Sequence, residues 1–304
     1  MPRSYRYLHL DVFTDHVFGG NQLAVVLDGR GLSPQTMQAI AKEMAFSETT
    51  FVLPPEHTNT DVRMRIFTPA DELPIAGHPT IGSAFALARA GVIEPGCQRF
   101  VFGLGIGPVP VSLTWKDKDL SFAWMTQPNP TFSEPIANPA GAAAAVGLSE
   151  AAVAGTGLPV QVVSSGVPFL FVPLVTRHAV DSAVGNRDAF DQLIRAAKVE
   201  AQGVFLFSRD RGADKADVYS RMFAPALGVA EDAATGSASG PLGCYLIRHK
   251  VVPAARAGSI LSLQGVKMGR PSYVHISIDL DRGDISGVRV GGESVLAGEG
   301  TLYV

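Results

Sequence analysis

The chain has 304 residues, of which 46% are hydrophobic and 17% are charged, and its formal net charge is −3. This length predicts two domains or one large one, and the composition excludes an intrinsically disordered protein, which combines low hydrophobicity with high net charge. The chain has no basic excess, so we expect neither nucleic acid nor a membrane surface as a partner.

The first half of the chain alternates strand and helix patterns. Ser33 followed by Pro34 predicts a helix start, because the hydroxyl caps the first turn and proline suits the first helical position. In chain order we expect strands at 5–13, 23–27, 50–53 and 62–68, helices at about 33–45 and 79–90, and further strands at 99–103, 109–115 and 120–126.

The second half follows a connection punctuated by prolines. Its alanine- and glycine-rich stretch at 140–147 predicts a loose, weakly packed segment. Beyond it we expect strands at 160–164, 169–175, 204–207, 218–223, 260–263, 272–279 and 287–290, and helices near 187–199 and 234–248.

The two halves repeat each other. Arg65-Ile-Phe-Thr-Pro69 recurs as Arg221-Met-Phe-Ala-Pro225, and at a separation of 154 residues Gly82-Ser-Ala84 recurs as Gly236-Ser-Ala238. Matches in the same order, at about half the chain length, indicate an internal duplication.

The same separation of 154 aligns individual polar residues. It superimposes the helix pattern at 34–45 on 188–199 and aligns His78 with Asp232. It also places Glu48 over Gln202, a neutral amide. We infer that the two halves carry different polar groups at matching places, which suggests a site between them.

These patterns predict an α+β fold of two similar halves. The second helix of each half, at 79–90 and 234–248, is apolar nearly all round, which is typical of a buried helix. We expect each half to curl a β-sheet around its buried helix, and the halves to meet across one cleft. The halves are predicted at 1–126, with the C-terminal strand 291–304 returning to it, and at 127–290.

Small residues crowd the turns before both buried helices, and His78 and Asp232 lie in these turns. A helix N-terminus has unpaired N–H groups and a partial positive charge, so it favours a carboxylate or phosphate. The alternatives are that Asp232 and Ser237 only cap the helix, that His78 is a pre-proline turn residue, and that Glu48 is a solvated loop carboxylate.

The residues that bind metals and cofactors are sparse. Cys97 and Cys244 cannot form a disulfide framework or a thiolate metal site, and the seven histidines lack metal-binding spacing. We therefore expect no metal and no organic cofactor. No apolar run reaches the roughly 18 residues of a membrane span, and the N-terminus enters a strand pattern without a signal-peptide stretch. These features predict a cytoplasmic protein.

A set of segments, in order from residue 11 to about residue 246, together resembles the signature of the phenazine-biosynthesis PhzF-like isomerase family. The segments are Asp11-Val-Phe-Thr14 with Phe18-Gly-Gly-Asn21, Ser47-Glu-Thr-Thr-Phe-Val52, Arg65-Ile-Phe-Thr-Pro69 with Glu72-Leu-Pro74, Ala76-Gly-His-Pro-Thr80 and Glu231-Asp-Ala-Ala-Thr-Gly-Ser237. The resemblance implies a diaminopimelate epimerase-like fold, which agrees with the fold expected from the repeat.

The resemblance also implies roles for single residues. Glu48 matches the acid/base glutamate of the family, while His78, Asp232 and Ser237 match residues that line the same pocket. Ala233 stands where the family pattern has proline. By the same resemblance we expect cofactor-free proton transfer on a small carboxylate-bearing cyclic substrate, and a homodimer.

The expected chemistry suits Glu48. A carboxyl that moves a proton between two carbons must have a pKa near the working pH. Apolar neighbours such as Phe46 and Phe51 would disfavour the charged carboxylate and raise the pKa of Glu48.

The remaining site residues are expected to bind the substrate. His78 and Asp232 can hold an amine or hydroxyl group. The backbone N–H groups at Gly77, and at Gly236 and Ser237, can hold a carboxylate.

Other functions remain open at this point. An epimerase or racemase of the same fold would use a thiol pair or another base, but neither Cys97 nor Cys244 lies at the repeated turns. A hydrolase built from Ser237, His78 and Asp232 would lack the G-x-S-x-G elbow. A third alternative is a binding protein that has lost its reaction.

Overall fold

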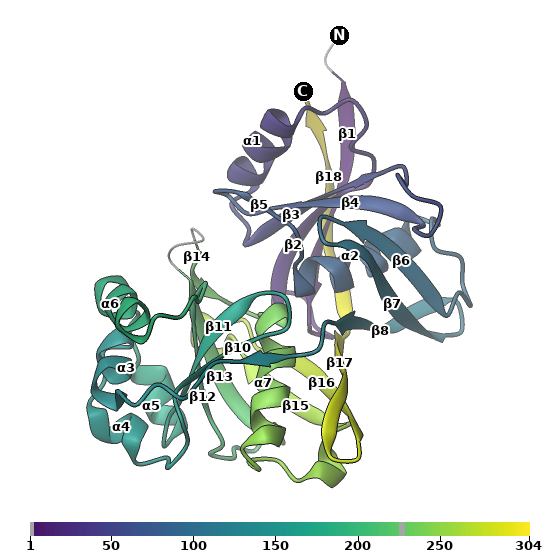
Figure 1. The fold of residues 1–304 in the computed structure, drawn as a ribbon. Helices are drawn as coiled ribbons and strands as arrows, with labels where there is room; N and C mark the ends of the chain where they lie inside the picture. The colour runs from purple at the N-terminus through teal and green to yellow at the C-terminus, as the bar shows by residue number, and fades with distance from the viewer. Residues whose placement is uncertain (1–2, 225–228) are drawn as a thin grey trace. The chain divides into compact units, whose positions relative to one another are not determined.

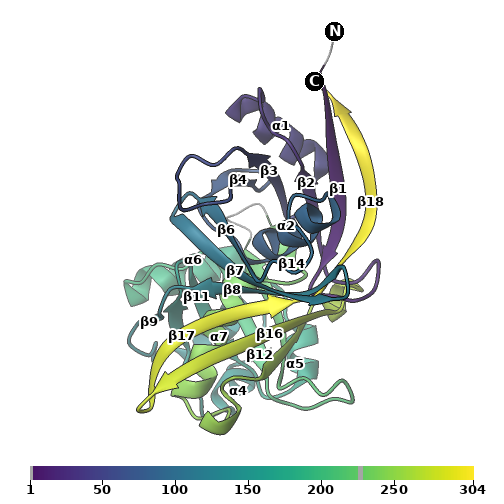
Figure 2. The same cartoon turned by 90° about the vertical axis from the view of Figure 1, so that its right-hand side faces the viewer.

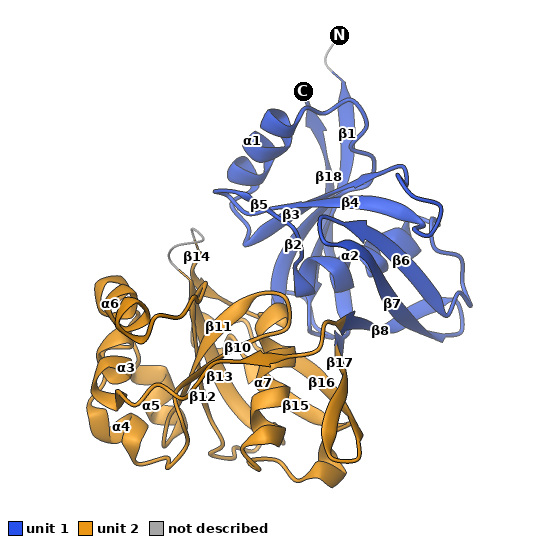
Figure 3. Cartoon of the chain, in the orientation of Figure 1, with its two compact units in different colours: residues 1–126, 290–304 blue, residues 127–289 orange. Residues whose placement is uncertain are grey.

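The computed structural model describes residues 3–224 and 229–304, so Pro225 of the repeated motif lies outside the described residues. The chain divides into two compact units, coloured separately in Figure 3. Unit 1 comprises residues 1–126 and 290–304, and unit 2 comprises residues 127–289. Within the described part of the chain, no helix is long and apolar enough to cross a membrane.

Unit 1 contains two helices and a rolled, mostly antiparallel sheet (Figure 1). Its elements are β1 (Ser4–Val12), β2 (Asn21–Val26), α1 (Pro34–Met44), β3 (Glu48–Leu53), β4 (Val62–Phe67), β5 (Glu72–Leu73), α2 (Gly77–Arg89), β6 (Arg99–Leu104), β7 (Gly107–Lys116), β8 (Asp119–Gln127) and β18 (Ser294–Tyr303).

The sheet of unit 1 follows a simple order of neighbours. Strand β18 returns from the C-terminus to pair with β1, and the two run side by side in Figure 2. The order continues through β2, β3, β4, β6, β7 and β8, and only the β2–β3 and β4–β6 pairs are parallel. Helix α1 packs on one face of this sheet and α2 on the other.

Both helices of unit 1 begin and pack as their sequences require. Ser33 caps α1, because its side chain accepts from the backbone N–H of Thr36. Helix α2 is buried along nearly its whole length, which confirms the predicted central helix. Gly82 of α2 lies so close to β1 and β2 that a Cβ would come within 2.6 Å of Val12 and Leu23. The small residues of α2 therefore permit a close helix–sheet approach.

Unit 2 contains a second sheet with more helices around it. Its elements are β9 (Thr131–Phe132), α3 (Pro139–Ala145), α4 (Glu150–Ala154), β10 (Gln161–Ser164), β11 (Pro168–Pro173), α5 (Arg177–Ser182), α6 (Arg187–Ala197), β12 (Val204–Ser208), β13 (Val218–Ala224), β14 (Val229–Asp232), α7 (Gly236–Arg248), β15 (Ile260–Gln264), β16 (Ser272–Asp281), β17 (Asp284–Gly292) and two short 3₁₀ helices (Ala254–Arg256 and Val266–Met268).

The strand pairing of unit 2 repeats that of unit 1. The pairs β11–β12 and β13–β15 are parallel, and β10–β11, β12–β13 and β15–β16 are antiparallel, as in the matching pairs of unit 1. Helix α7 is buried like α2, and a Cβ at its Gly243 would meet Ile276 of β16 at 2.4 Å. The duplication predicted from sequence is therefore present in the fold.

The alanine-rich stretch behind the proline-punctuated connection is a helix, so the prediction of a loose segment is wrong. Helix α3 starts at Pro139, and the side chain of Asn138 accepts from the backbone N–H of Gly141. Ala142, Ala143 and Ala145 are buried and pack in the core that α6 also covers. Alanine has the highest helix propensity and the smallest apolar side chain, so this helix packs closely.

The separation of 154 residues used to align the helix-start turns is also wrong, because the connections of the two units differ in length. Gly77 and Gly236 both begin 13-residue helices and are 159 residues apart. Gly82 is the sixth residue of its helix, so its match to Gly236 by residue type does not reflect structure. In both helices a hydroxyl donates to the carbonyl four residues back, from Thr80 to Ala76 and from Ser239 to Thr235.

The structural alignment of the two units gives the site residues other counterparts than the sequence alignment does. His78 and Ser237 are each the second residue of their helix, so His78 does not correspond to Asp232. Asp232 pairs with Met222 of β13 as Leu73 pairs with Ile66 of β4.

The counterpart of Glu48 also changes. The β3–β4 and β12–β13 registers place Thr49 opposite Phe67 and Val204 opposite Phe223, so Glu48 corresponds to Gly203 and not to Gln202.

An arginine–glutamate pair links equivalent strands in the two units. Arg65 makes two parallel hydrogen bonds to Glu72, at 2.7 and 2.6 Å, and Arg221 makes two to Glu231, at 2.7 and 2.8 Å. Each pair ties the strand carrying the Arg-x-Phe motif to the short strand before the central helix. This repeated contact holds in place the short strand that leads into the turn before each central helix.

Candidate active site

The predicted site residues form two clusters, one in each unit. We call Glu48, Gly77 and His78 the unit 1 cluster, where β3 and α2 begin. We call Asp232, Gly236 and Ser237 the unit 2 cluster, where β14 ends and α7 begins.

The unit 1 cluster joins a carboxyl to a buried imidazole. Glu48 Oε2 lies 3.3 Å from His78 Nδ1, and the two side chains are 13% and 3% exposed. His78 Nε2 lies 3.3 Å from the backbone oxygen of Gln22, and Asn21 Nδ2 lies 3.3 Å from His78 Nδ1. Ser47 donates to the Asn21 side-chain oxygen at 3.3 Å. Strand β2 thus orients the imidazole toward Glu48.

Burial keeps His78 neutral. Removal from water disfavours the imidazolium and lowers the pKa of His78 to about 3, although the hydrogen bond to Gln22 acts in the opposite direction. At neutral pH the contact between Glu48 and His78 is therefore not an ion pair.

The tautomer of His78 follows from its neighbours. A carbonyl oxygen only accepts, so Nε2 carries the hydrogen that faces Gln22. In a neutral ring Nδ1 is then an acceptor, and it receives an N–H from Asn21. The Nδ1 lone pair also faces Glu48, where it can accept a hydrogen bond from a protonated carboxyl.

The surroundings of Glu48 differ in part from the prediction. Side chains alternate along β3, and Thr50, two residues after Glu48, bonds Ser83 of α2 at 3.0 Å. Phe51 lies on the opposite face and packs with Met37 of α1. The expectation that Phe51 encloses the Glu48 carboxyl is therefore wrong, since α2 borders that face.

The unit 2 cluster holds Asp232 in a buried hydrogen-bonded turn. Thr235 Oγ1 donates to Asp232 Oδ2 at 2.7 Å, and Gln264 Nε2 donates to the Asp232 backbone oxygen at 2.8 Å. Asp232, Thr235 and Gln264 are all buried. Thr235 therefore holds the carboxylate of Asp232, and Gln264 of β15 holds its backbone.

Both central helices present uncapped N-termini. No side chain caps α2 or α7 at its N-cap position, so Gly77 and Gly236 begin helices whose first N–H groups are not covered by a cap. Such groups favour an anionic ligand. Ser237 is half-buried, and within the described part of the chain its hydroxyl has no hydrogen-bond partner.

The cysteines lie away from both clusters. Cys244 is buried within α7, and burial raises the pKa of its thiol to about 12. Cys97 lies in the loop before β6 and contacts the backbone oxygen of Arg99. Over residues 3–224 and 229–304, no three His, Cys, Asp or Glu side chains gather as metal ligands would.

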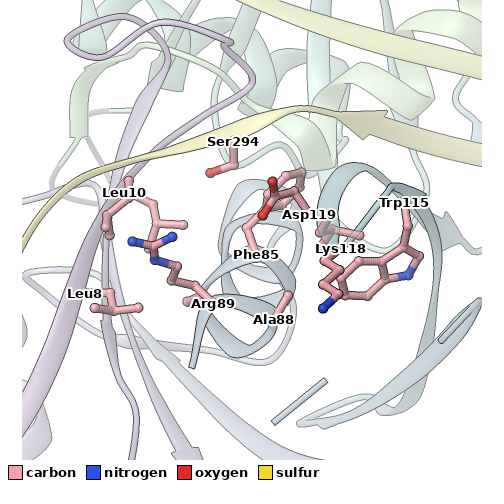
Figure 4. Close-up of a pocket in the computed structure, with 12 residues that line it drawn as sticks. Leu8, Leu10, Phe85, Ala88, Arg89, Trp115, Lys118, Asp119 and Ser294 are labelled. Carbon is pink, nitrogen blue, oxygen red and sulfur yellow. The ribbon is translucent and has the colours of Figure 1, made fainter. Parts of the chain in front are cut away.

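A pocket of about 390 Å³ in unit 1 contains none of the predicted site residues (Figure 4). Phe85 and Arg89 from the last turns of α2 line it, with Leu10 of β1 and Trp115 of β7. His78 is near the other end of this helix, about 10 Å from Phe85 and about 17 Å from Arg89 along the helix axis. The pocket is therefore separate from the unit 1 cluster.

Sequence reasoning missed the residues that hold the two clusters in place. Asn21 stands in a segment quoted for the family resemblance, and no role was assigned to it. Thr235 stands in another such segment. Gln264 is a polar residue at the end of an apolar strand, and this change in polarity was the signal that could have marked it.

Comparison with known proteins identifies similar chains over the full length. A family model described as phenazine biosynthesis-like protein matches residues 10–300. The trans-2,3-dihydro-3-hydroxyanthranilate isomerase of Pseudomonas aeruginosa is 37% identical over 300 residues, which cover 99% of this chain and 100% of that enzyme.

Solved structures show the same fold. A Bacillus anthracis phenazine biosynthesis protein of the PhzF family has a TM-score of 0.86 at 25% identity, covering 99% of this chain and 100% of that one. A hydroxyproline epimerase from Agrobacterium vitis has a TM-score of 0.70 at 14% identity, covering 100% and 94%. The second likeness concerns the fold alone, and the predicted diaminopimelate epimerase-like α+β fold is confirmed.

Proposed function

Because the chain belongs to the phenazine biosynthesis-like family and is an isomerase, we propose that it moves a proton between two carbons of a small cyclic carboxylate. Glu48 is the acid/base group in this proposal. The observation that carries it is the contact of Glu48 with a buried, neutral imidazole.

The Glu48–His78 pair suits a group that serves first as base and then as acid. When the carboxylate takes a proton from a substrate carbon, the new O–H can donate to His78 Nδ1 at the observed 3.3 Å. The bond holds the proton until Glu48 returns it to another carbon. A neutral imidazole is required for this role, because an imidazolium has no free lone pair.

The other predicted residues bind the substrate in this proposal. The N–H group of Gly77 at the start of α2, and those of Gly236 and Ser237 at the start of α7, can each hold an anionic group such as a carboxylate. Asp232 holds an amine or hydroxyl group. This part of the proposal rests on the family resemblance and on the matching position of the helix-start turns in the two units.

The alternatives have less support from the geometry. A serine hydrolase needs a histidine bonded to both the serine and the aspartate. His78 instead uses one ring nitrogen on Gln22 and the other on Asn21 and Glu48. A thiol-pair racemase is disfavoured because Cys244 is buried in α7. A binding protein without activity would have no need of the Glu48–His78 pair.

We also propose that the enzyme is a cytoplasmic homodimer that needs no cofactor. The homodimer rests on the family resemblance, the cytoplasmic location on the sequence features given above, and the lack of a cofactor on both. Sedimentation equilibrium tests the oligomeric state directly, and a single species at the mass of one chain would contradict it.

The function is tested by incubating the protein with trans-2,3-dihydro-3-hydroxyanthranilate in deuterated water. Product should form with deuterium at a ring carbon, read by proton NMR and mass spectrometry. Glu48→Gln keeps the shape and removes the proton chemistry, so turnover should fall by about 10²–10⁴-fold while substrate binding changes little.

Variants of the binding residues provide the contrast. Asp232→Asn should weaken binding and turnover together, because Asp232 orients the substrate, whereas His78→Gln should lower turnover more than binding, because His78 acts through Glu48. If Glu48→Gln keeps more than about a tenth of the wild-type rate, Glu48 is not the acid/base group. If the wild type incorporates no deuterium into this substrate or into related cyclic amino carboxylates, the proposed function is wrong.

A further inference from the structure

Thr235 precedes α7 at the N-cap position, yet its hydroxyl does not cap the helix. Threonine at an N-cap ordinarily accepts a hydrogen bond from a backbone N–H two or three residues later. Here Oγ1 donates instead to Asp232 Oδ2 at 2.7 Å. A residue type that could stabilise the helix is thus used to hold the carboxylate.

Gln264 fixes the direction of this hydrogen bond. Its Oε1 accepts from the Thr235 backbone N–H at 3.1 Å, and its Nε2 donates to the Asp232 backbone oxygen at 2.8 Å. A backbone N–H only donates and a carbonyl only accepts, so the orientation of the Gln264 amide is unambiguous.

The same amide nitrogen also donates to Thr235 Oγ1, at 3.0 Å. Because Thr235 Oγ1 accepts there, its own hydrogen points to Asp232. The result is a directed chain from Gln264 through Thr235 to the Asp232 carboxylate. All three residues are buried, with exposed fractions of 0%, 5% and 5%.

Unit 1 shows that the fold does not need this chain. At the equivalent positions it has Ala76 at the N-cap of α2, Leu73 in β5 and Leu104 at the end of β6. All three polar residues are thus apolar in the other copy of the same fold. Two units with the same strand pairing and the same 13-residue helix therefore differ in this network.

A close backbone approach occurs at the same place in both units. A Cβ at Gly265 would meet the Ala233 backbone oxygen at 2.5 Å, and one at Gly105 would meet the Cα of Pro74 at 2.9 Å. In each unit the strand end is pressed against the turn before the helix. The close approach is common to both copies, and only the polar side chains are particular to unit 2.

From this contrast we propose that Thr235 and Gln264 are positioning residues for Asp232. They hold its carboxylate through one directed hydrogen bond and its backbone through another, in the orientation in which it meets the substrate. The inference rests on the proposed function, in which Asp232 binds the substrate.

The test replaces each residue by its unit 1 counterpart and measures kcat and KM with trans-2,3-dihydro-3-hydroxyanthranilate. Thr235→Ala and Gln264→Leu should each lower kcat/KM by about 10-fold or more, because the first removes the hydrogen bond to the charged Asp232 carboxylate and the second removes the bonds that orient Thr235 and the Asp232 backbone. Thr235→Ser keeps the hydroxyl and should stay within about threefold of wild type. In an Asp232→Asn background neither change should lower kcat/KM further, because both act through Asp232.

Ser239→Ala is the matched control. Its hydroxyl is buried on the same turn but bonds the helix's own Thr235 carbonyl, so kcat/KM should be unchanged. Thermal unfolding of every variant shows whether the fold is intact.

The inference is overturned if Thr235→Ala keeps full activity, if Thr235→Ser fails to restore it, or if the losses persist in the Asp232→Asn background. A wild type without turnover, or an Asp232→Asn variant as active as wild type, would instead overturn the proposed function. These two failures are therefore distinguishable.

Discussion

A buried histidine next to a carboxyl couples the pH to the stability of unit 1. The pKa of His78 is about 3 in the folded protein, because burial disfavours the imidazolium, and about 6.5 in an unfolded chain. Between these two values the unfolded state binds more protons than the folded state. The free energy of unfolding therefore rises with pH across this window and is lost as pH falls.

We predict that His78→Asn flattens this pH dependence. As pH falls from about 6 to 4, the free energy of unfolding of the wild type should decrease by about 1.4 kcal/mol more per pH unit than that of the variant. This is the slope expected when unfolding takes up one proton. Urea unfolding at a series of pH values measures both slopes. His57→Asn is the control, since His57 is exposed. Parallel curves for wild type and His78→Asn would contradict the prediction.

At the scale of elements, the two arginine–glutamate pairs make the same contact between equivalent strands but differ in burial. The Arg221 side chain is 7% exposed, and it also donates to three backbone oxygens, those of Val180, Asp181 and Ala183. The Arg65 side chain is 14% exposed, and its partner Glu72 is 41% exposed. If the arginine is removed, water can therefore replace more of its hydrogen bonds in unit 1 than in unit 2.

We predict that Arg221→Met destabilises the protein much more than Arg65→Met. Removing Arg221 leaves a half-buried glutamate and three carbonyls without their donor, at a cost of about 3–5 kcal/mol. Removing Arg65 leaves a glutamate that water can reach, at a cost of about 1 kcal/mol. Urea unfolding gives both values. Equal losses would show that burial does not distinguish the two pairs.

At the scale of the whole molecule, the proposal of a cofactor-free isomerase has a direct test. Exhaustive dialysis against EDTA should leave turnover within about twofold of the untreated protein, because a general acid/base such as Glu48 needs no metal. Activity assays before and after dialysis measure this. A loss that a divalent ion restores would refute it.

Much of the architecture was predictable because it depends on local pattern. Helices that are apolar all round must be buried, and both α2 and α7 are. The Arg-x-Phe motif marked the duplication correctly, and the family segments pointed to Glu48 and His78, which the fold places in contact.

The errors arose where an outcome depends on register or on the length of a connection. The chain from Phe223 to Gly236 is three residues longer than that from Phe67 to Gly77, so the helices lie 159 residues apart and not 154. The placement of Phe51 failed because neighbouring strand residues point to opposite faces.

The sequence by itself determined the fold class, the internal repeat and the residue types able to carry the chemistry, because periodicity and motif order are local properties of the chain. Only the tertiary structure decided which polar side chains hydrogen-bond to the predicted site residues. Asn21 reaches His78 across 57 residues, and Gln264 reaches Asp232 across 32, through strand pairings that bring distant segments together. The identity of a buried polar partner depends on that pairing, and a shift of one residue would turn the side chain to the other face of the sheet.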